Sequence, residues 1–415
     1  MTDIPYSIDL PSPVSKVLSR LNAAGCRAYV VGGCTRDAIM GKTPADWDVT
    51  TDAAPDIVKE IFADERVIET GIRHGTVTIL SGGMQIETTT FRVDGEYTDS
   101  RHPDTVSFTR SLTDDLSRRD FTMNAIAYNP KEGFLDPFDG MADIGNGIIR
   151  AVGSPEKRFS EDALRIMRAV RFSSTLGFGI APEAEEAIDS CRGLLLNISV
   201  ERIGSELLKT LSGSNAENAV RDHGGMFAVI IPELRPLIAD DALWTKTAAD
   251  VAAVDPEDCL KLAMLFLRSG EVVSKIPVIS AKLSAVTAKT ALRRMKFPKK
   301  TILTVSVLVD ASGRPVPGSK PDIKRMLRDI GPDKFNGFLR IKTAVDEDIT
   351  KAEKLLSEIE RNREPYLLKH LAVKGSDIPL NAPGGTTGEI LSSLLDLVIE
   401  HPEMNDRDTL LSSLN

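Results

Sequence analysis

The spacing of hydrophobic and polar residues changes once along this chain, near residue 152. Before that point, short apolar runs alternate with polar and turn residues, which is typical of strands, and two stretches have helical spacing. The predicted strands are 27–31, 46–50, 75–80, 84–91 and 104–110, and the predicted helices are 12–24 and 55–63. This pattern predicts a small α/β head.

After the turn Gly153-Ser154-Pro155, the spacing is almost entirely helical. The predicted helices are 160–176, 182–190, 199–211, 215–222, 256–267, 283–295, 301–311, 319–330, 333–361 and 386–400. Proline and glycine gather at 312–321 and 379–385, which we expect to be loops. The predicted fold is therefore an α/β head with a mixed sheet, followed by a long all-α body.

Composition narrows the function classes. With 415 residues, 42% hydrophobic and 27% charged, the chain suits a globular protein of about two to four domains. A net charge of −9 argues against a nonspecific nucleic-acid binder, although a local basic stripe remains compatible with it. The four cysteines show no C-x-x-C spacing, and neither a signal peptide nor a membrane-spanning run is present. We therefore expect a cytoplasmic protein that neither enters a membrane nor has a disulfide framework.

Asp46 and Asp48 are the most informative residues. Side chains two apart on a strand point to the same face, so these carboxylates can converge on one divalent cation. The preceding apolar strand ends at Gly32-Gly33, just before the helix-like stretch Arg36 to Met40. Glycines at a strand-to-helix turn let backbone N–H groups approach a phosphate. A phosphate cradle beside a metal site predicts nucleotidyl transfer. Each motif alone would be an ordinary turn.

Two further residues fit this chemistry. Two-metal sites usually use a third carboxylate from a neighbouring strand. Alternation places Glu87 on one face with Gln85 and Thr89, while Ile86 points into the core; a solvent-facing glutamate is the equal alternative. Arg119 follows Arg118 just before an apolar stretch, and we predict that it clamps triphosphate oxygens or ribose; a solvated helix start is the alternative.

The predicted helix 160–176, with Ser160 as its N-cap, carries a ridge of charge. Asp162, Arg165, Arg168 and Arg171 follow one another at steps of three. Three arginines with one aspartate indicate an anion or nucleobase site, and a salt-bridged surface is the alternative. Cytosine and adenine both present an amino donor beside a ring-nitrogen acceptor. Asp162 with Arg165 would therefore admit CTP and ATP and refuse GTP and UTP.

Six segments in the first half of the chain form a series. They are GGCTRD (32–37), DWD (46–48), GIRHGTVTI (71–79), IETTTFRVDGEYTDSRHPDTVSF (86–108), RRDFTMNAIAY (118–128) and EDALRIMRAVRF (161–172). Their order resembles the bacterial class II tRNA nucleotidyltransferase and poly(A) polymerase family, which includes the CCA-adding enzymes. The sequence of residues 71–79 is more similar to that of the tRNA nucleotidyltransferases than to that of the poly(A) polymerases.

The resemblance implies a polymerase-β-like head at 1–152, a helical neck at 153–212, a body at 213–278 and a tail at 279–415. It implies Mg²⁺ at Asp46 and Asp48, with Glu87 as third carboxylate. Together with the reasoning above, the resemblance also implies a set of residues that contact the nucleotide. They are Gly32, Gly33, Arg36, Arg119, Asp162, Arg165, Arg168 and Arg171.

The implied substrate is tRNA, and the best candidates for its contacts are basic. One stripe consists of Arg293, Arg294, Lys296, Lys299 and Lys300, and a second consists of Lys320, Lys324, Arg325 and Arg328. Either could contact an RNA backbone, and a solvated helix face is equally compatible with each.

The resulting hypothesis is template-independent addition of CCA to tRNA from CTP and ATP, with no stable protein partner. The segment 92–103 resembles the intact flexible loop of enzymes that also add the terminal A; a plain hairpin connection is its alternative. An A-adding or CC-adding enzyme, or a poly(A) polymerase, is the alternative within the class. A noncatalytic RNA-binding protein with a vestigial head is the alternative outside it.

Overall fold

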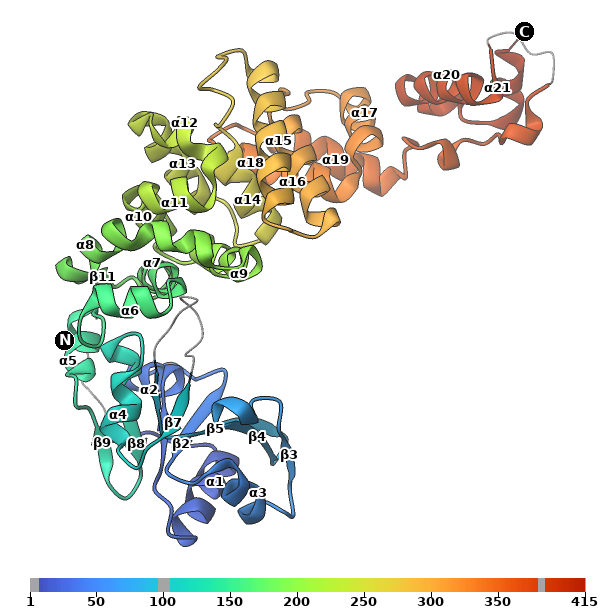
Figure 1. The fold of residues 1–415 in the computed structure, drawn as a ribbon. Coiled ribbons are helices and arrows are strands. Elements are labelled where there is room, and N and C mark those ends of the chain that lie inside the picture. Colours follow the sequence, from blue (N-terminus) through green and yellow to red (C-terminus); the bar gives the residue numbers. More distant parts are fainter. Residues whose placement is uncertain (1–6, 96–104, 380–384, 415) are drawn as a thin grey trace. The chain divides into compact units, whose positions relative to one another are not determined.

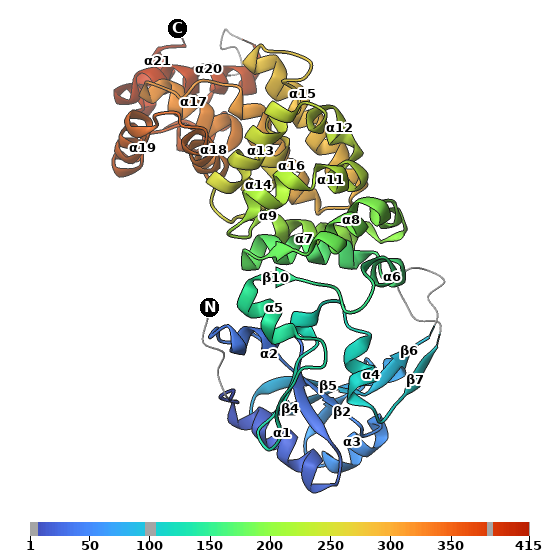
Figure 2. The same cartoon turned by 90° about the vertical axis from the view of Figure 1, so that its left-hand side faces the viewer.

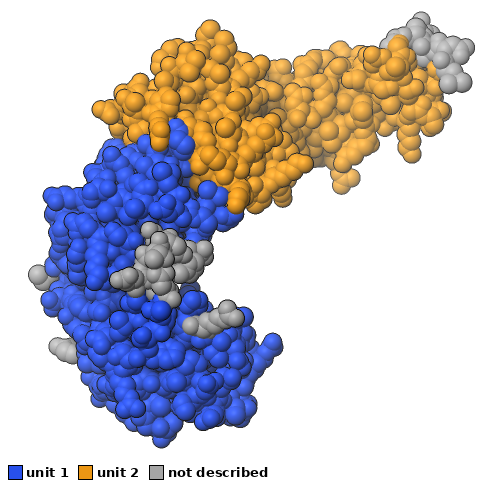
Figure 3. Space-filling view, in the orientation of Figure 1, with its two compact units in different colours: residues 1–232 blue, residues 233–415 orange. Residues whose placement is uncertain are grey.

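The computed structural model describes residues 7–95, 105–379 and 385–414. The chain divides into two compact units, Met1–Pro232 and Glu233–Asn415 (Figure 3). The four domain boundaries predicted from the sequence stay predictions. Most of the expected flexible loop at 92–103 lies outside the described residues.

The first unit begins with a mixed seven-stranded sheet in the order β3-β4-β5-β2-β1-β8-β9 (Figure 1). Its strands are β1 Ala28–Val31, β2 Trp47–Thr51, β3 Arg66–Ile68, β4 Thr76–Ser81, β5 Met84–Thr90, β8 Ala127–Asn129 and β9 Gly133–Leu135. Strand β2 is antiparallel to β1 and parallel to β5. The α/β head is therefore confirmed, and β3, β8 and β9 are strands that the sequence pattern missed.

The two faces of the sheet differ. Helices α1 (Ser12–Ala23) and α3 (Pro55–Ile61) cover one face, where alternate strand residues such as Val49 and Ile86 form a core with them. Asp48 and Glu87 alternate with these residues and so lie on the opposite face. Helix α4 (Leu112–Ser117) lies on that side, beside the hairpin of β6 (Arg92–Asp94) and β7 (Val106–Phe108) (Figure 2).

The turn between β1 and helix α2 (Gly33–Ile39) depends on Gly32. Its backbone has φ +84° and ψ −137°, a conformation that residues with a Cβ rarely adopt. A Cβ at this position would also lie 3.4 Å from Nη1 of Arg119 and 3.7 Å from Oδ2 of Asp48. The glycine therefore allows the backbone to approach both side chains.

The rest of the first unit is mainly helical. Its elements are α5 Gly140–Asn146, β10 Ile148–Ile149, α6 Pro155–Glu161, α7 Leu164–Leu176, β11 Gly179–Ile180, α8 Pro182–Cys191, α9 Val200–Leu211, α10 Ala216–Asp222 and α11 Gly224–Ile230.

The prediction of one helix over 160–176 is wrong, because the chain is extended at Asp162 (φ −136°, ψ 102°). Ser160 lies inside α6, which starts earlier because Pro155 is a favourable first helical residue and Ser154 caps it through the backbone N–H of Lys157.

The second unit consists of helices. They are α12 Arg235–Ile238, α13 Asp241–Ala253, α14 Asp258–Phe266, α15 Pro277–Arg294, α16 Lys299–Ser312, α17 Lys320–Ile330, α18 Pro332–Ala344, α19 Thr350–Asn362, α20 Thr387–Glu400 and α21 Arg407–Ser412. The helix predicted over 333–361 is two helices, since the backbone turns at Asp346 with φ +64°. Across the described residues, no helix combines the length and apolar character that crossing a membrane requires.

Candidate active site

Two carboxylates lie opposite each other on the face of the sheet away from α1 and α3, and a third lies near enough to act on one of them electrostatically. In the parallel pairing of β2 and β5, Asp48 lies directly opposite Glu87, and Asp46 immediately precedes β2. Asp48 is half-buried, whereas Asp46 and Glu87 are exposed. Ile86 is fully buried, so the predicted orientation of Glu87 away from the core is confirmed.

The electrostatics of this group fit a divalent cation. Burial, together with the negative charges of Asp46 and Glu87, raises the pKa of Asp48 to about 6. The carboxylates therefore repel one another, and a divalent cation between them would relieve the repulsion.

The protein supplies only part of a coordination shell. In the described part of the chain, no three carboxylate, imidazole or thiol groups converge tightly enough to form a complete metal cage. Mg²⁺ is commonly bound by one or two carboxylates together with substrate phosphates, so a partial ligand set suits it. Its expected ligands are Asp46 and Asp48.

Arg119 lies beside Asp48. Its positive charge opposes the rise in the pKa of Asp48, and its Nη1 approaches Gly32. Its Nη2 donates to Oδ2 of Asp115 over 3.2 Å. The position of Arg119 next to the glycine turn is that expected of a triphosphate clamp.

Asp115 is a residue that the sequence analysis missed. It is fully buried on α4 and accepts hydrogen bonds from both Arg118 and Arg119. Its sequence signal is the helical spacing of three and four residues to the two arginines. The same spacing in an exposed helix would form only a weak surface pair, so burial is what distinguishes Asp115.

A chain of polar contacts connects predicted nucleotide residues on α2 to α7. Nη1 of Arg36 donates to Oδ1 of Asn124 over 2.8 Å, and the amide of Asn124 donates to Asp120 over 3.1 Å. Nε of Arg168 donates to Asp120 over 2.7 Å. Burial alone would raise the pKa of Asp120, but Arg168 and Asn124 lower it to about 2. The contacts join α2 to α7.

Phe172 is a second missed residue. The guanidinium carbons of Arg171, Arg36 and Arg168 lie 4.0, 5.0 and 5.3 Å from the centre of its ring. Cation–π attraction explains how three arginines gather at one place. Arg171 also forms an ion pair of 2.9 Å with Glu206 on α9.

The structure corrects the geometry of the predicted base reader. Asp162 lies between α6 and α7, so it does not continue the ridge of Arg165, Arg168 and Arg171. Its Oδ1 accepts from the N–H of Leu164 over 3.0 Å, and its Oδ2 accepts from Arg202 over 3.1 Å.

Arg165 has partners of its own. Its guanidinium donates to Glu161 over 2.9 Å and to the carbonyl of Arg118 over 3.1 Å. The contact with Arg118 links α7 to the segment that carries Arg119. Asp162 lies just before the start of α7, and Arg165 lies in its first turn.

The predicted RNA-binding residues lie in the second unit. Arg293 and Arg294 end α15, Lys299 and Lys300 begin α16, and Lys296 lies between the two helices. All five are exposed. Arg294 makes two hydrogen bonds of 2.9 Å with Glu233.

The structure contradicts the second basic stripe at Lys324, and the other three residues of the stripe are all in ion pairs. Lys324 is 1% exposed, and its ammonium group contacts the carbonyl of Ile399 and Glu364. Lys320 pairs with Glu358 and Glu364, Arg325 with Glu400 and Arg328 with Asp396. These charges connect α17 to later segments of the chain, which helical spacing alone could not reveal.

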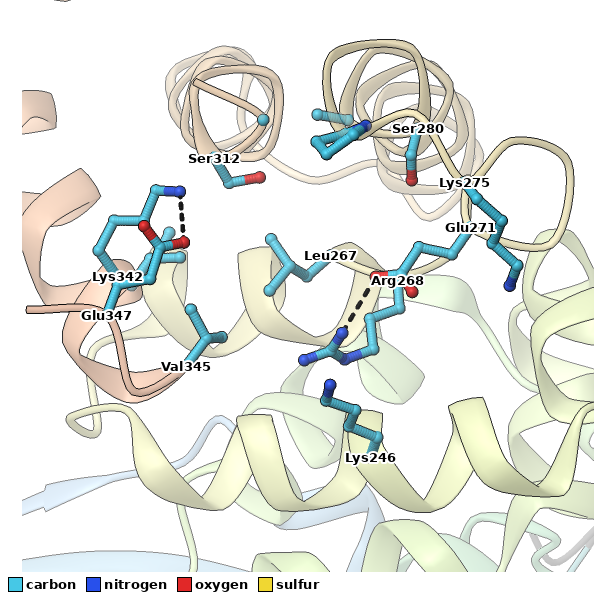
Figure 4. Close-up of a pocket in the computed structure, with 14 residues that line it drawn as sticks. Lys246, Leu267, Arg268, Glu271, Lys275, Ser280, Ser312, Lys342, Val345 and Glu347 are labelled. Atoms are coloured by element: carbon cyan, nitrogen blue, oxygen red, sulfur yellow. Dashed lines mark hydrogen bonds and ion pairs between the residues drawn. The ribbon is translucent and has the colours of Figure 1, made fainter. Parts of the chain in front are cut away.

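A cavity of about 350 Å³ lies between helices of the second unit (Figure 4). Its buried cations are already paired, Arg268 with Glu271 and Lys342 with Glu347. The described residues that line it include none of the predicted site residues.

Comparisons with known proteins show the family to which the chain belongs. Residues 28–150 match the family described as "Poly A polymerase head domain", and residues 177–238 match "Probable RNA and SrmB- binding site of polymerase A". A CCA-adding enzyme of Ligilactobacillus salivarius is 34% identical over 96% of this chain and 94% of its own length.

Two other relatives differ in coverage. A CCA-adding enzyme of Levilactobacillus brevis is 49% identical, but the match covers 53% of this chain and spans about half of that relative, 54% of its length. The crystal structure of the Bacillus stearothermophilus CCA-adding enzyme in complex with CTP is 31% identical, with a TM-score of 0.75 over 98% of this chain and 97% of that one.

The raised pKa of Asp48 predicts a stability effect. In the presence of a chelator at pH 7.5, Asp48→Asn should raise the free energy of unfolding by about 1 to 3 kcal/mol, because it removes an uncompensated carboxylate. A carboxyl with a raised pKa takes up its proton in the folded state as the pH falls through 6, so its destabilising effect is complete above pH 6 and disappears towards pH 4. Urea denaturation from pH 7.5 to pH 5 should therefore show that the difference in the free energy of unfolding between Asp48→Asn and the wild type becomes smaller.

The control is Asp56→Asn, an exposed change on α3. An Asp48→Asn variant that is less stable than the wild type at pH 7.5 would contradict the prediction.

Proposed function

The chain belongs to the family of CCA-adding enzymes, and on that premise we propose that it adds CCA to the 3′ end of tRNA from CTP and ATP, without a template and with release of pyrophosphate. The observation that carries the proposal is the register of β2 and β5, which brings Asp48 and Glu87 together beside Gly32 and Arg119. The Bacillus stearothermophilus enzyme forms a complex with CTP, which supports the choice of nucleotide.

Asp46 and Asp48 are the residues proposed to hold Mg²⁺, with Glu87 as the third carboxylate. The family implies a divalent metal, and oxygen ligands with open positions favour Mg²⁺. When bound, the metal would activate the primer hydroxyl and stabilise the charge that develops on the leaving pyrophosphate. The carboxylates of the protein fix where this chemistry takes place.

The triphosphate is proposed to lie against the glycine turn. Backbone N–H groups after Gly32 and Gly33, at the start of α2, would donate to its oxygens. Arg119 would also donate hydrogen bonds to the triphosphate oxygens. These groups orient the α-phosphate towards the primer and away from water.

The base is proposed to be read where α6 meets α7. Asp162 would accept a hydrogen bond from the exocyclic amino group of cytosine or adenine, and Arg165 would donate to the adjacent ring nitrogen. The bonds from Leu164 and Arg202 hold the Asp162 carboxylate in place for this role. Guanine and uracil would leave both protein groups unpaired.

The tRNA backbone is proposed to contact α15 and α16. Between Glu271 and Asp310 the chain has eight basic residues and no acidic one, within a protein of net charge −9. All eight are exposed. They are Lys275, Lys282, Lys289, Arg293, Arg294, Lys296, Lys299 and Lys300. Phosphate contacts of this kind recognise the shape of an RNA helix. A cytoplasmic location remains a prediction that fits this substrate.

Asp46→Ala tests the proposed reaction. With tRNAs that lack A, CA or CCA, the wild type should restore the full end when CTP and ATP are both present. With CTP alone it should add only the missing C residues, and with ATP alone it should add A only to the tRNA that already ends in CC. The variant should lose roughly a thousandfold in rate, because metal assistance supplies several kcal/mol. Gel analysis of labelled tRNA measures both results. Asp56→Ala should keep its activity, and a wild type that adds only A or only CC would assign the narrower activity.

Asp162→Ala tests the base reader. Discrimination against UTP and GTP should weaken roughly tenfold to a hundredfold, since a buried group left unpaired costs about 1 to 3 kcal/mol. The measurement is kcat/KM for each nucleotide with one tRNA primer. Glu156→Ala, on the exposed side of α6, is the matched control. Unchanged exclusion of UTP and GTP would remove the assignment.

Arg293→Ala and Lys299→Ala test the RNA surface. Each should weaken tRNA binding and reduce the slope of log affinity against log salt by about one unit per lost phosphate contact. Filter binding at several salt concentrations measures this. Lys354→Ala, an exposed lysine on α19, should leave the slope unchanged. The same slope in all variants would place the RNA elsewhere.

A further inference from the structure

We propose that Asp115 is a positioning residue that fixes Arg119 for the triphosphate and keeps it from pairing with Asp48, a proposed metal ligand. The proposal rests on the proposed function, because it assigns a second role within the same site. It concerns a residue that touches neither substrate nor metal and acts through Arg119.

Asp115 is the meeting point of three segments of the head, which are β2, β6 and α4 with the residues directly after it. It is fully buried. Its Oδ2 accepts from Oγ1 of Thr50 over 3.1 Å and from Nη2 of Arg119 over 3.2 Å. Its Oδ1 accepts from Nε and Nη2 of Arg118 over 3.0 and 2.8 Å and from the N–H of Arg92 over 3.3 Å. All its acceptor positions are therefore used by protein groups.

The partners of Asp115 connect it to both parts of the site. Thr50 is two residues after Asp48, on the same face of β2. The Nη1 of Arg119 reaches the turn at Gly32, where a Cβ on Gly32 would lie 3.4 Å from it. The guanidinium of Arg119 thus spans from Asp115 to the proposed phosphate cradle.

Arg119 keeps hydrogen-bonding capacity for a ligand. Its Nε is buried and has no hydrogen-bond partner among the described residues. A buried donor without a partner is costly, so a ligand oxygen that reaches it would be favoured. Asp115 occupies Nη2 and leaves the remaining edge of the guanidinium for phosphate.

The charge on Asp115 is needed for this arrangement. Burial alone would raise the pKa of Asp115, but the charges of Arg119 and Arg118 hold it below its ordinary value, so it is ionised at neutral pH. Without that charge, the repulsion between Arg118 and Arg119 would be uncompensated, and Asp48, on whose carboxylate Arg119 already acts, would attract Arg119. An arginine paired with Asp48 would compete with the divalent cation.

The test is the binding of inorganic triphosphate, which needs neither tRNA nor transfer. Isothermal calorimetry should show about tenfold weaker binding in Asp115→Asn, the effect expected when a hydrogen bond between charged groups loses one charge. In an Arg119→Gln background the same substitution should change binding less than about twofold, because residues that act as a unit are not additive. Asp114→Asn, the exposed neighbour on α4, should bind as the wild type does.

Additive effects of Asp115→Asn and Arg119→Gln would overturn the proposal, as would a wild type without measurable triphosphate binding. Should Asp115→Asn fail to fold, judged by its unfolding midpoint, Thr50→Val removes one hydrogen bond to Asp115 at nearly constant volume. It should weaken binding about twofold to fivefold in the wild type alone. A wild type that binds triphosphate as expected but transfers no nucleotide would remove the proposed function and leave the role of Asp115.

Discussion

Repulsion between like charges on neighbouring strands is the constraint around which the head is built. The parallel register of β2 and β5 forces Asp48 and Glu87 to lie opposite each other, and Asp46 adds a third negative charge. Like charges opposite each other destabilise a sheet. The apolar core on the other face, built from α1, α3 and residues such as Val49 and Ile86, offsets that cost and holds the strands together. A fold that keeps such a group ready for a cation gives up stability for function.

Arginines balance this negative group, and buried carboxylates determine where each arginine lies. Asp115 holds Arg118 and Arg119 at the sheet, and Asp120 holds Arg168 of the neck. Breaking one side of a buried pair leaves the other charge uncompensated, so each pair fixes its position strongly. As a result, the groups proposed to bind phosphate and those proposed to read the base belong to one connected network, joined by the contact of Arg165 with the carbonyl of Arg118.

Predictions from the sequence were correct where the structure depends on the local spacing of hydrophobic residues along a strand or helix. The alternation around Glu87 predicts its face correctly because Ile86 must be buried, and helical spacing predicts most of the second half of the chain. They were wrong where the position of a side chain depends on a partner that is far away in the sequence. Asp162 interrupts the predicted helix because its carboxylate accepts from the N–H of Leu164 at the start of α7 and pairs with Arg202, forty positions away. Lys324 has the same spacing as an exposed lysine, but Glu364 and the carbonyl of Ile399 bury it.

The two basic stripes illustrate why neighbouring acids matter more than the number of bases. On α17, every basic residue of the stripe has a carboxylate partner, so its charge stabilises the fold and is not available to a polyanion. Over α15 and the start of α16 the sequence has no acid at all, and Glu233 reaches this region from outside to pair with Arg294. The net charge of −9 gives the protein as a whole a repulsive interaction with RNA. Concentrating bases on one face gives attraction and orientation together, because the acidic remainder disfavours other ways of binding.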